Sequence, residues 1–253
     1  MSAIAIAAIT FVCTFGCAWL GTVIRSTLPQ SHMSKESQDV VRLGMGLVAT
    51  MTALLLGLVT AAAKGTFDSQ DLAVRNSAVN ILTLDRHLAR YGPETKPIRD
   101  LVHRAVAARI EAMWPAKGVS PPPANVIEPS SPAEEGQNMI LALTPGNDAQ
   151  RWHKSEAVGL TDELVKTRWR VVVSRGGAVP RAFLIVVIFW LTATFGSFGL
   201  YAPRNGTVLS VFILASLSVA AAVFLILELD SPTEGLIRIS GEPLRFVLAH
   251  IGK

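Results

Sequence analysis

The chain has 253 residues, of which half are hydrophobic and only 17% are charged, with a formal net charge of +4. Ordinary soluble domains carry about 25% charged residues, so this composition excludes that class. The small basic surplus is scattered along the sequence and gives no support for nucleic-acid binding.

Four long stretches contain no Asp, Glu, Lys or Arg. An α-helix rises about 1.5 Å per residue, so roughly 20 apolar residues cross the hydrocarbon core of a bilayer. The stretches therefore predict four membrane-spanning helices, two before and two after a polar middle region. They are Met1–Ile24, Leu43–Ala63, Ala182–Ala202 and Asn205–Leu227.

The first stretch has no basic residue ahead of its apolar run, which favours a retained span over a cleaved secretory signal. Cys13 and Cys17 are the only cysteines, and they share a helical face with Gly21. Such small residues let two helices approach closely, so this face predicts helix packing rather than redox or metal chemistry.

Basic residues beside the spans predict the orientation. Four crossings place the two termini and the middle region on one side, and that side holds most of the Lys and Arg near span ends. The positive-inside rule therefore predicts that both termini and the middle region are cytoplasmic. The basic residues on that side are Lys64, Arg75, Arg168, Arg170, Arg175, Arg181, Arg238 and Arg245, against Arg25, Lys35, Arg42 and Arg204 opposite.

The middle region is expected to be a small helical domain. Apolar residues recur at helical spacing over Asp68–Arg90 and Glu94–Trp114, and further helices are predicted around Ala133–Leu143 and over Asp148–Ser174. A proline-rich linker, residues 118–132, separates the two pairs. The predicted class is all-α in a 2+2 arrangement: hairpin 1–63, cytoplasmic domain 64–181, hairpin 182–228 and cytoplasmic tail 229–253.

Several blocks, in order, resemble one family. They cover most of the chain from about residue 40 and comprise Ala49–Val59 with Ala63-Lys64 and Phe67-Asp68, Leu84-Asp85-Arg86, Tyr91-Gly92-Pro93-Glu94, Arg168-Trp169, Phe198–Asn205 and Leu225–Asp230 with Pro232 and Gly235-Leu236-Ile237. The chain is similar here to the bestrophin-like DUF4239 proteins, integral membrane proteins of bacteria.

The resemblance implies an ion channel in the bacterial inner (plasma) membrane. Bestrophins are oligomeric ion channels with four spans and cytoplasmic termini, so a homo-oligomer, pentameric by analogy, and permeant ions are the expected partners besides the lipid bilayer. Since fold does not settle function, ion conduction needs support from the residues themselves.

The second span offers that support. A stripe of small or weakly polar residues recurs at alternating spacings of four and three, so its members share one face. The face predicts either a pore lining or close packing against another helix. We call it the small stripe; it consists of Gly46, Thr50, Ala53, Gly57, Thr60 and Lys64.

Acidic residues follow the fourth span. Repeated around a ring, Glu228, Asp230 and Glu234 would attract cations to a cytoplasmic pore mouth. The alternative is structural: Asp230 ends the helix, Pro232 and Gly235 complete a turn, and the acids pair with Lys64 or Arg181.

Catalytic patterns are missing from the sequence. The five histidines show no metal-ligand spacing, and no phosphate loop, nucleophile elbow or dinucleotide motif occurs. We therefore expect no enzyme activity, catalytic residue, metal or cofactor. A non-conducting scaffold or signalling module, recruiting partners through the cytoplasmic helices, is the alternative to a channel.

Overall fold

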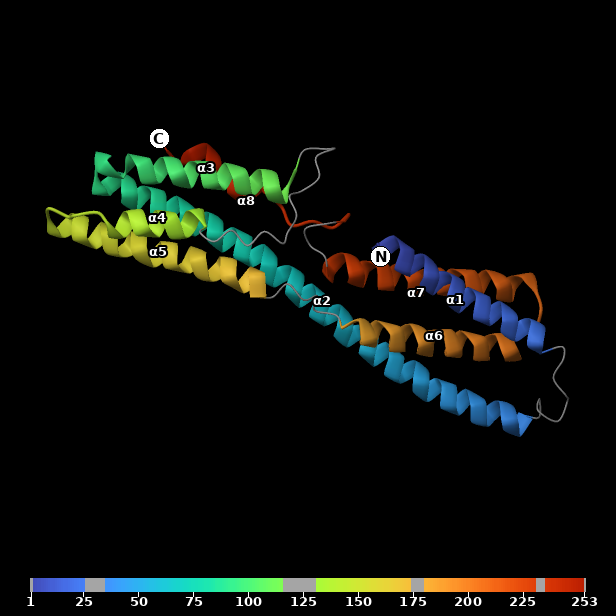
Figure 1. The fold of residues 1–253 in the computed structure, drawn as a ribbon. Helices are drawn as coiled ribbons and strands as arrows, with labels where there is room; N and C mark the ends of the chain where they lie inside the picture. Colours follow the sequence, from blue (N-terminus) through green and yellow to red (C-terminus); the bar gives the residue numbers. More distant parts are fainter. Residues whose placement is uncertain (1, 26–34, 116–130, 174–179, 231–234, 253) are drawn as a thin grey trace. The chain divides into compact units, whose positions relative to one another are not determined.

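The computed structural model describes residues 2–25, 35–115, 131–173, 180–230 and 235–252, and within these ranges it is helical without a strand (Figure 1). Four of its helices are long and apolar enough to cross a membrane. The predicted all-α class with four spans is thus confirmed. The division of the sequence into two hairpins, a cytoplasmic domain and a tail stays a prediction.

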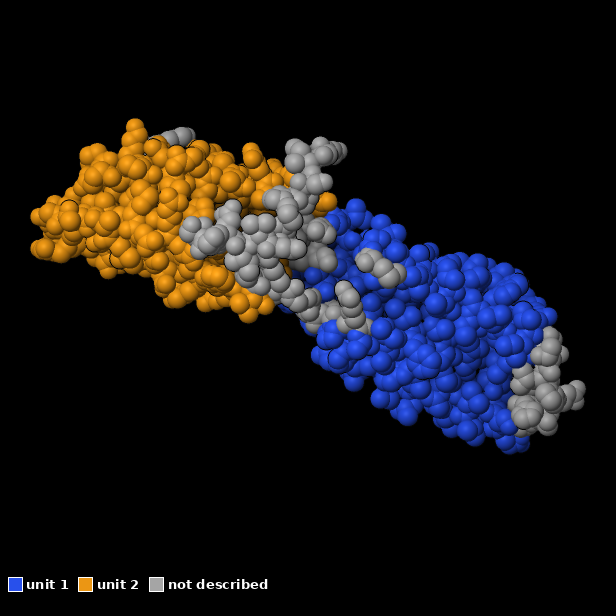
Figure 2. Space-filling model, in the orientation of Figure 1, with its two compact units in different colours: residues 1–67, 177–237 blue, residues 68–176, 238–253 orange. Residues whose placement is uncertain are grey.

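The chain forms two compact units, which Figure 2 distinguishes by colour. Unit 1 consists of residues 1–67 and 177–237, and unit 2 of residues 68–176 and 238–253. Unit 1 contains the four apolar stretches. Its helices are α1 (Ala3–Ile24), the first part of α2 (Lys35–Tyr91), α6 (Arg181–Tyr201) and α7 (Gly206–Asp230).

Helix α1 packs against both α6 and α7 in unit 1. The contact with α6 is close because small residues meet: a Cβ at Gly199 would overlap the backbone of Ala18, and one at Gly196 would lie 2.8 Å from the Cys17 sulfur. Gly21 likewise faces the α6 backbone. The predicted use of the Cys13–Gly21 region for helix packing therefore applies to Cys17 and Gly21, while Cys13 is exposed.

Two arginines form hydrogen bonds at the C-terminal ends of α1 and α6. The Arg25 guanidinium donates a 2.6 Å hydrogen bond to the Ala202 carbonyl, and Arg204 donates to the carbonyls of Thr22 and Val23 at 2.9 and 3.2 Å. Helix C-termini leave carbonyls without intrahelical partners, and cations there are favoured by the helix dipole. Arg25, which follows α1, therefore caps the end of α6, and Arg204, which follows α6, caps the end of α1.

Helix α2 corrects one expectation. The sequence analysis treated Asp68–Arg90 as a helix of the middle region, distinct from the second span, but α2 runs without interruption for 57 residues. At about 1.5 Å per residue it is about 85 Å long. Between the two predicted segments Gly65 is the residue with the lowest helical propensity, and one glycine costs about 1 kcal/mol, which does not end a helix.

Unit 2 is a bundle of the remaining helices. The short η2 (Pro93–Thr95) leads from α2 into α3 (Lys96–Met113), followed by α4 (Pro132–Leu141) and α5 (Asp148–Val173). Its core joins α2, α3, α4 and α5 through Leu84, Leu88, Ile98, Ile140 and Ala157. Most of the predicted proline-rich linker, residues 118–130, lies outside the described residues.

The end of the chain adds α8 (Glu242–His250), which the sequence analysis did not anticipate and which packs on α3. Gly241 lies against the Trp114 ring, whose Nε1 donates to the Ile239 carbonyl at 2.8 Å. Residues 238–252 are therefore part of the folded unit.

A buried ion pair links α2 to α3. The Asp85 carboxylate, 1% exposed, accepts hydrogen bonds from Arg99 Nε at 2.7 Å and a terminal guanidinium nitrogen at 3.1 Å. This hydrogen bond raises the pKa of Arg99, so the guanidinium stays charged. The Gly252 amide also donates to Asp85 at 3.4 Å, which explains the acidic residue of the Leu84-Asp85-Arg86 block.

Candidate functional site

The part of α2 in unit 1 has one buried side and a wide exposed side. Thr52, Val59 and Ala63 are buried, and the last two pack against Ile226 and Leu229 of α7. The small stripe lies on other sides of the helix: Gly46, Thr50, Ala53, Gly57 and Lys64 are exposed, and Thr60 is half-buried. The structure thus keeps the predicted stripe together and largely uncovered by its own chain.

The glycines of the stripe show this most directly. A Cβ added at Gly46 or Gly57 would meet no other side chain or neighbouring helix within 4 Å. At these two glycines, therefore, no described part of the same chain packs closely against the stripe.

The threonine hydroxyls of the stripe bond to their own helix. Thr50 Oγ1 donates to the Gly46 and Leu47 carbonyls at 2.9 and 2.8 Å, and Thr60 Oγ1 donates to the Leu56 carbonyl at 2.7 Å. A hydroxyl has one proton and two lone pairs. Both groups are therefore satisfied as donors in lipid while each oxygen still offers lone pairs to water or a cation.

A second exposed surface of α2 lies beside the stripe and is strongly apolar. The side chains of Leu47, Leu54 and Leu58 are 64%, 76% and 62% exposed, and Met51 is 47% exposed. The helix thus presents two sides of different chemistry: a small, weakly polar one and a large apolar one.

Lys64 ends the stripe. Its ammonium lies 5.7 Å from the centre of the Phe67 ring, a cation–π contact that leaves the side chain exposed. It is the one basic member of the predicted pore lining.

The predicted acidic mouth is only partly described. Glu228 is 6% exposed, and its Oε2 accepts the amides of Leu236 and Ile237 at 2.5 and 3.3 Å. Gly235 adopts φ +111°, and a Cβ there would lie 2.8 Å from the Glu228 carboxyl carbon. Glu228 thus holds the backbone at residues 235–237, a role that neither interpretation of the acidic residues included. Asp230 is half-buried at the end of α7, and Glu234 lies outside the described residues.

In the comparison with protein families, the model of the Bestrophin-like domain matches residues 12–244. The chain belongs to the Bestrophin-like family. This confirms the resemblance drawn from the sequence blocks, and the match extends it back into the first span, to residue 12. The comparison with curated proteins found no significant match.

A solved structure supports the fold of this Bestrophin-like chain. A mutated bacterial bestrophin homolog from Klebsiella pneumoniae aligns with a TM-score of 0.68 over 95% of this chain and 98% of its own. The sequences are 14% identical over that alignment, so the likeness establishes a shared fold.

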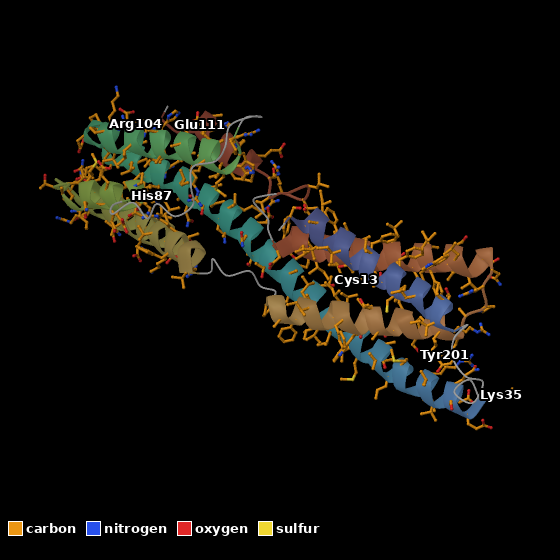
Figure 3. All side chains as sticks on the ribbon, turned by 45° about the vertical axis from the view of Figure 1, so that its right-hand side comes forward. Cys13, Lys35, His87, Arg104, Glu111 and Tyr201 are labelled. Atoms are coloured by element: carbon orange, nitrogen blue, oxygen red, sulfur yellow. The ribbon has the colours of Figure 1, made fainter. Side chains whose placement is uncertain are left out.

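Sequence reasoning missed an open groove of about 520 Å³ in unit 1 of the Bestrophin-like chain. It adjoins the first residue of the small stripe and is bordered by α2, α6 and α7. Figure 3 labels Tyr201, one of its residues. No periodicity signals such a space, because its lining residues come from three helices, of which α2 is far from α6 and α7 in the sequence. The lining includes Arg42, Met45, Gly46, Phe198, Tyr201 and Val211.

Among the described residues of the Bestrophin-like chain, no group of three His, Cys, Asp or Glu side chains is placed to hold a metal ion. The notable titratable pair there is His87 and His153, whose Nδ1 atoms lie 3.1 Å apart in unit 2. The sequence separates them by 66 residues, so no spacing motif would have found the pair.

Proposed function

We propose that this chain assembles into an oligomeric membrane ion channel and that ions pass along an axis lined by the small stripe of α2. The observation that carries the proposal is the stripe itself: it follows one face of a spanning helix and remains open in the single chain. Family membership favours a transport role over catalysis.

The chemistry of the two exposed α2 surfaces assigns them different neighbours. An apolar surface of leucines gains contact from lipid or from another span, whereas glycines and hydroxyls tolerate water at close range. With copies arranged about an axis, the stripe faces the water-filled centre and the leucine side faces neighbouring protein or lipid. Five copies, by analogy with bestrophins, is the proposed stoichiometry.

Selectivity in such a pore is weak. Hydroxyls present both donor and acceptor, and the proposed lining carries no charge before Lys64. Lys64 and Asp230 are therefore the proposed charges at the cytoplasmic mouth, with Glu234 retained as a prediction. Glu228 drops out of this proposal, because its carboxylate is already held by the turn and assembly only adds to burial.

The direct test is flux through purified protein. Liposomes loaded with a salt gradient should release ions when they contain the wild-type oligomer, with mass measurement in mild detergent showing more than one copy. A wild-type monomer would remove the basis of the pore. A well-folded oligomer without flux at any voltage or pH would favour the scaffold alternative.

Orientation has its own test. The proposed location is the bacterial inner membrane with both termini cytoplasmic. In a Cys13→Ala, Cys17→Ala background, the Ser34→Cys variant should react with an impermeant thiol reagent on intact cells, and Ser130→Cys should react only after lysis. Labelling of Ser130→Cys from outside would overturn the orientation.

A further inference from the structure

An imidazole pair joins two helices of unit 2 at the edge of its core. His87 comes from α2, where Figure 3 labels it, and His153 comes from α5. Their Nδ1 atoms are 3.1 Å apart, and their rings meet edge to face with centroids 5.2 Å apart. Trp152 packs on both rings, at 5.2 Å from His87 and 4.8 Å from His153. The two side chains are therefore held in place rather than free in solvent.

This distance has two chemical explanations. One neutral imidazole donates an N–H to the other, or the two nitrogens point their lone pairs at one metal ion. Zinc–nitrogen bonds are about 2.0–2.1 Å long. If two nitrogens bind one zinc ion at an N–metal–N angle of about 100°, they lie about 3.1 Å from each other. That angle suits a tetrahedral or octahedral ion, so the pair already has the separation that chelation needs.

The pair lies in a partly shielded place, because both imidazoles are half-buried and pack against Trp152. Neutral imidazole is the ligand form of histidine. Glu156 follows His153 by three positions on α5, so it adds negative charge on the same side without being needed as a ligand.

We propose that His87 and His153 form a two-histidine binding site for a divalent transition-metal ion, which links α2 to α5. With two protein nitrogens, water fills the remaining coordination positions. Imidazole selects zinc, nickel, cobalt or copper(II) over magnesium and calcium, which prefer oxygen ligands. The site lies beside Leu84, Leu88 and Ala157 of the unit 2 core, so an ion there fastens the same two helices as that core.

The test is calorimetric titration of the purified, chelator-treated full chain with ZnCl₂ and NiCl₂ at pH 7.5. We expect saturable binding of one ion per chain in the micromolar range, weakened at least about tenfold in both His87→Ala and His153→Ala. His103→Ala, which removes an exposed histidine of α3, should bind like the wild type.

A second variant separates metal binding from folding. His87→Asn keeps a side chain that hydrogen-bonds with His153 but is a poor ligand, so its helix content should match the wild type while its zinc affinity falls. If the wild type binds none of these ions at millimolar concentration, the pair is a hydrogen bond and the proposal is wrong. Binding that persists unchanged in both histidine variants would overturn it equally.

Discussion

Two helix faces in unit 1 carry the same kind of residue and have opposite surroundings. Gly21 on α1 and Gly199 on α6 lie inside a contact so close that neither has room for a methyl group. Gly46 and Gly57 on α2 have no neighbouring group within 4 Å of the place a Cβ would occupy. Close approach needs small residues on both helices, and α6 supplies them to α1 through Gly196 and Gly199.

The difference shows what a small stripe does and does not reveal. It marks a face without bulky side chains, and the sequence does not say what lies against that face: for α1 it is another helix of the same chain, whereas no described residue lies within 4 Å of a Cβ at Gly46 or Gly57 of α2. Substitutions at the two sets of glycines should therefore have different effects. Those at the α1–α6 contact should lower the stability of the fold, and those in the small stripe of α2 should lower ion flux.

The largest expected effect is at the α1–α6 contact. Gly199→Ala places a methyl group on the Ala18 backbone, which no rotamer can relieve, so the helices must separate. Overpacking of this kind costs about 3 kcal/mol. Thermal denaturation in detergent, followed by circular dichroism, should show a markedly lower melting temperature. Gly16→Ala, whose Cβ meets nothing within 4 Å, is the matched control, and equal melting of the two variants would contradict the close packing.

The second effect is on flux and not on the fold. Gly57→Leu adds an apolar side chain to the open stripe, so the monomer folds normally while the proposed pore gains a hydrophobic constriction. Flux per oligomer should fall by about an order of magnitude. The control is Gly44→Leu, which adds the same side chain to α2 away from the stripe, at a position where a Cβ also meets nothing within 4 Å. If both variants conduct like the wild type, the small stripe does not line the path.

The spans and most helices of unit 2 were predictable because their signals are local. Absence of charge over about 20 residues and apolar recurrence at helical spacing need no knowledge of the rest of the chain. The uninterrupted run of α2 was missed because the change from apolar to polar composition suggested a boundary where the backbone has none. Composition changes with environment, while a helix ends where its hydrogen bonds end.

Contacts between residues far apart in the chain could not be predicted from the sequence, for a different reason. The small stripe was found by spacing alone, but the burial of Glu228 depends on a turn eight residues away, and His87 meets His153 across 66 residues. Such contacts follow from tertiary packing, which leaves no periodic signature. Hence the candidate pore face was predictable, whereas the role of Glu228 and the imidazole pair were not.

A smaller effect sharpens the contrast at the end of the α1–α6 contact. Arg204→Ala removes hydrogen bonds to the Thr22 and Val23 carbonyls, and since Arg204 is exposed we expect a loss of about 1 kcal/mol. The melting temperature should fall by less than in Gly199→Ala. Arg204→Lys, which keeps the charge but loses the forked geometry, should recover part of the loss. A variant as stable as the wild type would show that the arginine cap contributes nothing.

The smallest predicted effect concerns the charge that ends the α2 stripe. If Lys64 faces the mouth, Lys64→Glu should move the reversal potential towards cations under a salt gradient, and Asp230→Lys should move it the other way. The change in permeability ratio should be only about twofold, because a wet mouth screens charge over about 8 Å at physiological salt. It should therefore grow when the ionic strength is lowered, which distinguishes an electrostatic effect from a structural one. Lys96→Glu reverses an exposed lysine of α3 in unit 2 and should leave the reversal potential unchanged. If both mouth variants conduct ions with the same reversal potential as the wild type, Lys64 and Asp230 do not face the ion path. The open face of α2 would then serve contact between copies.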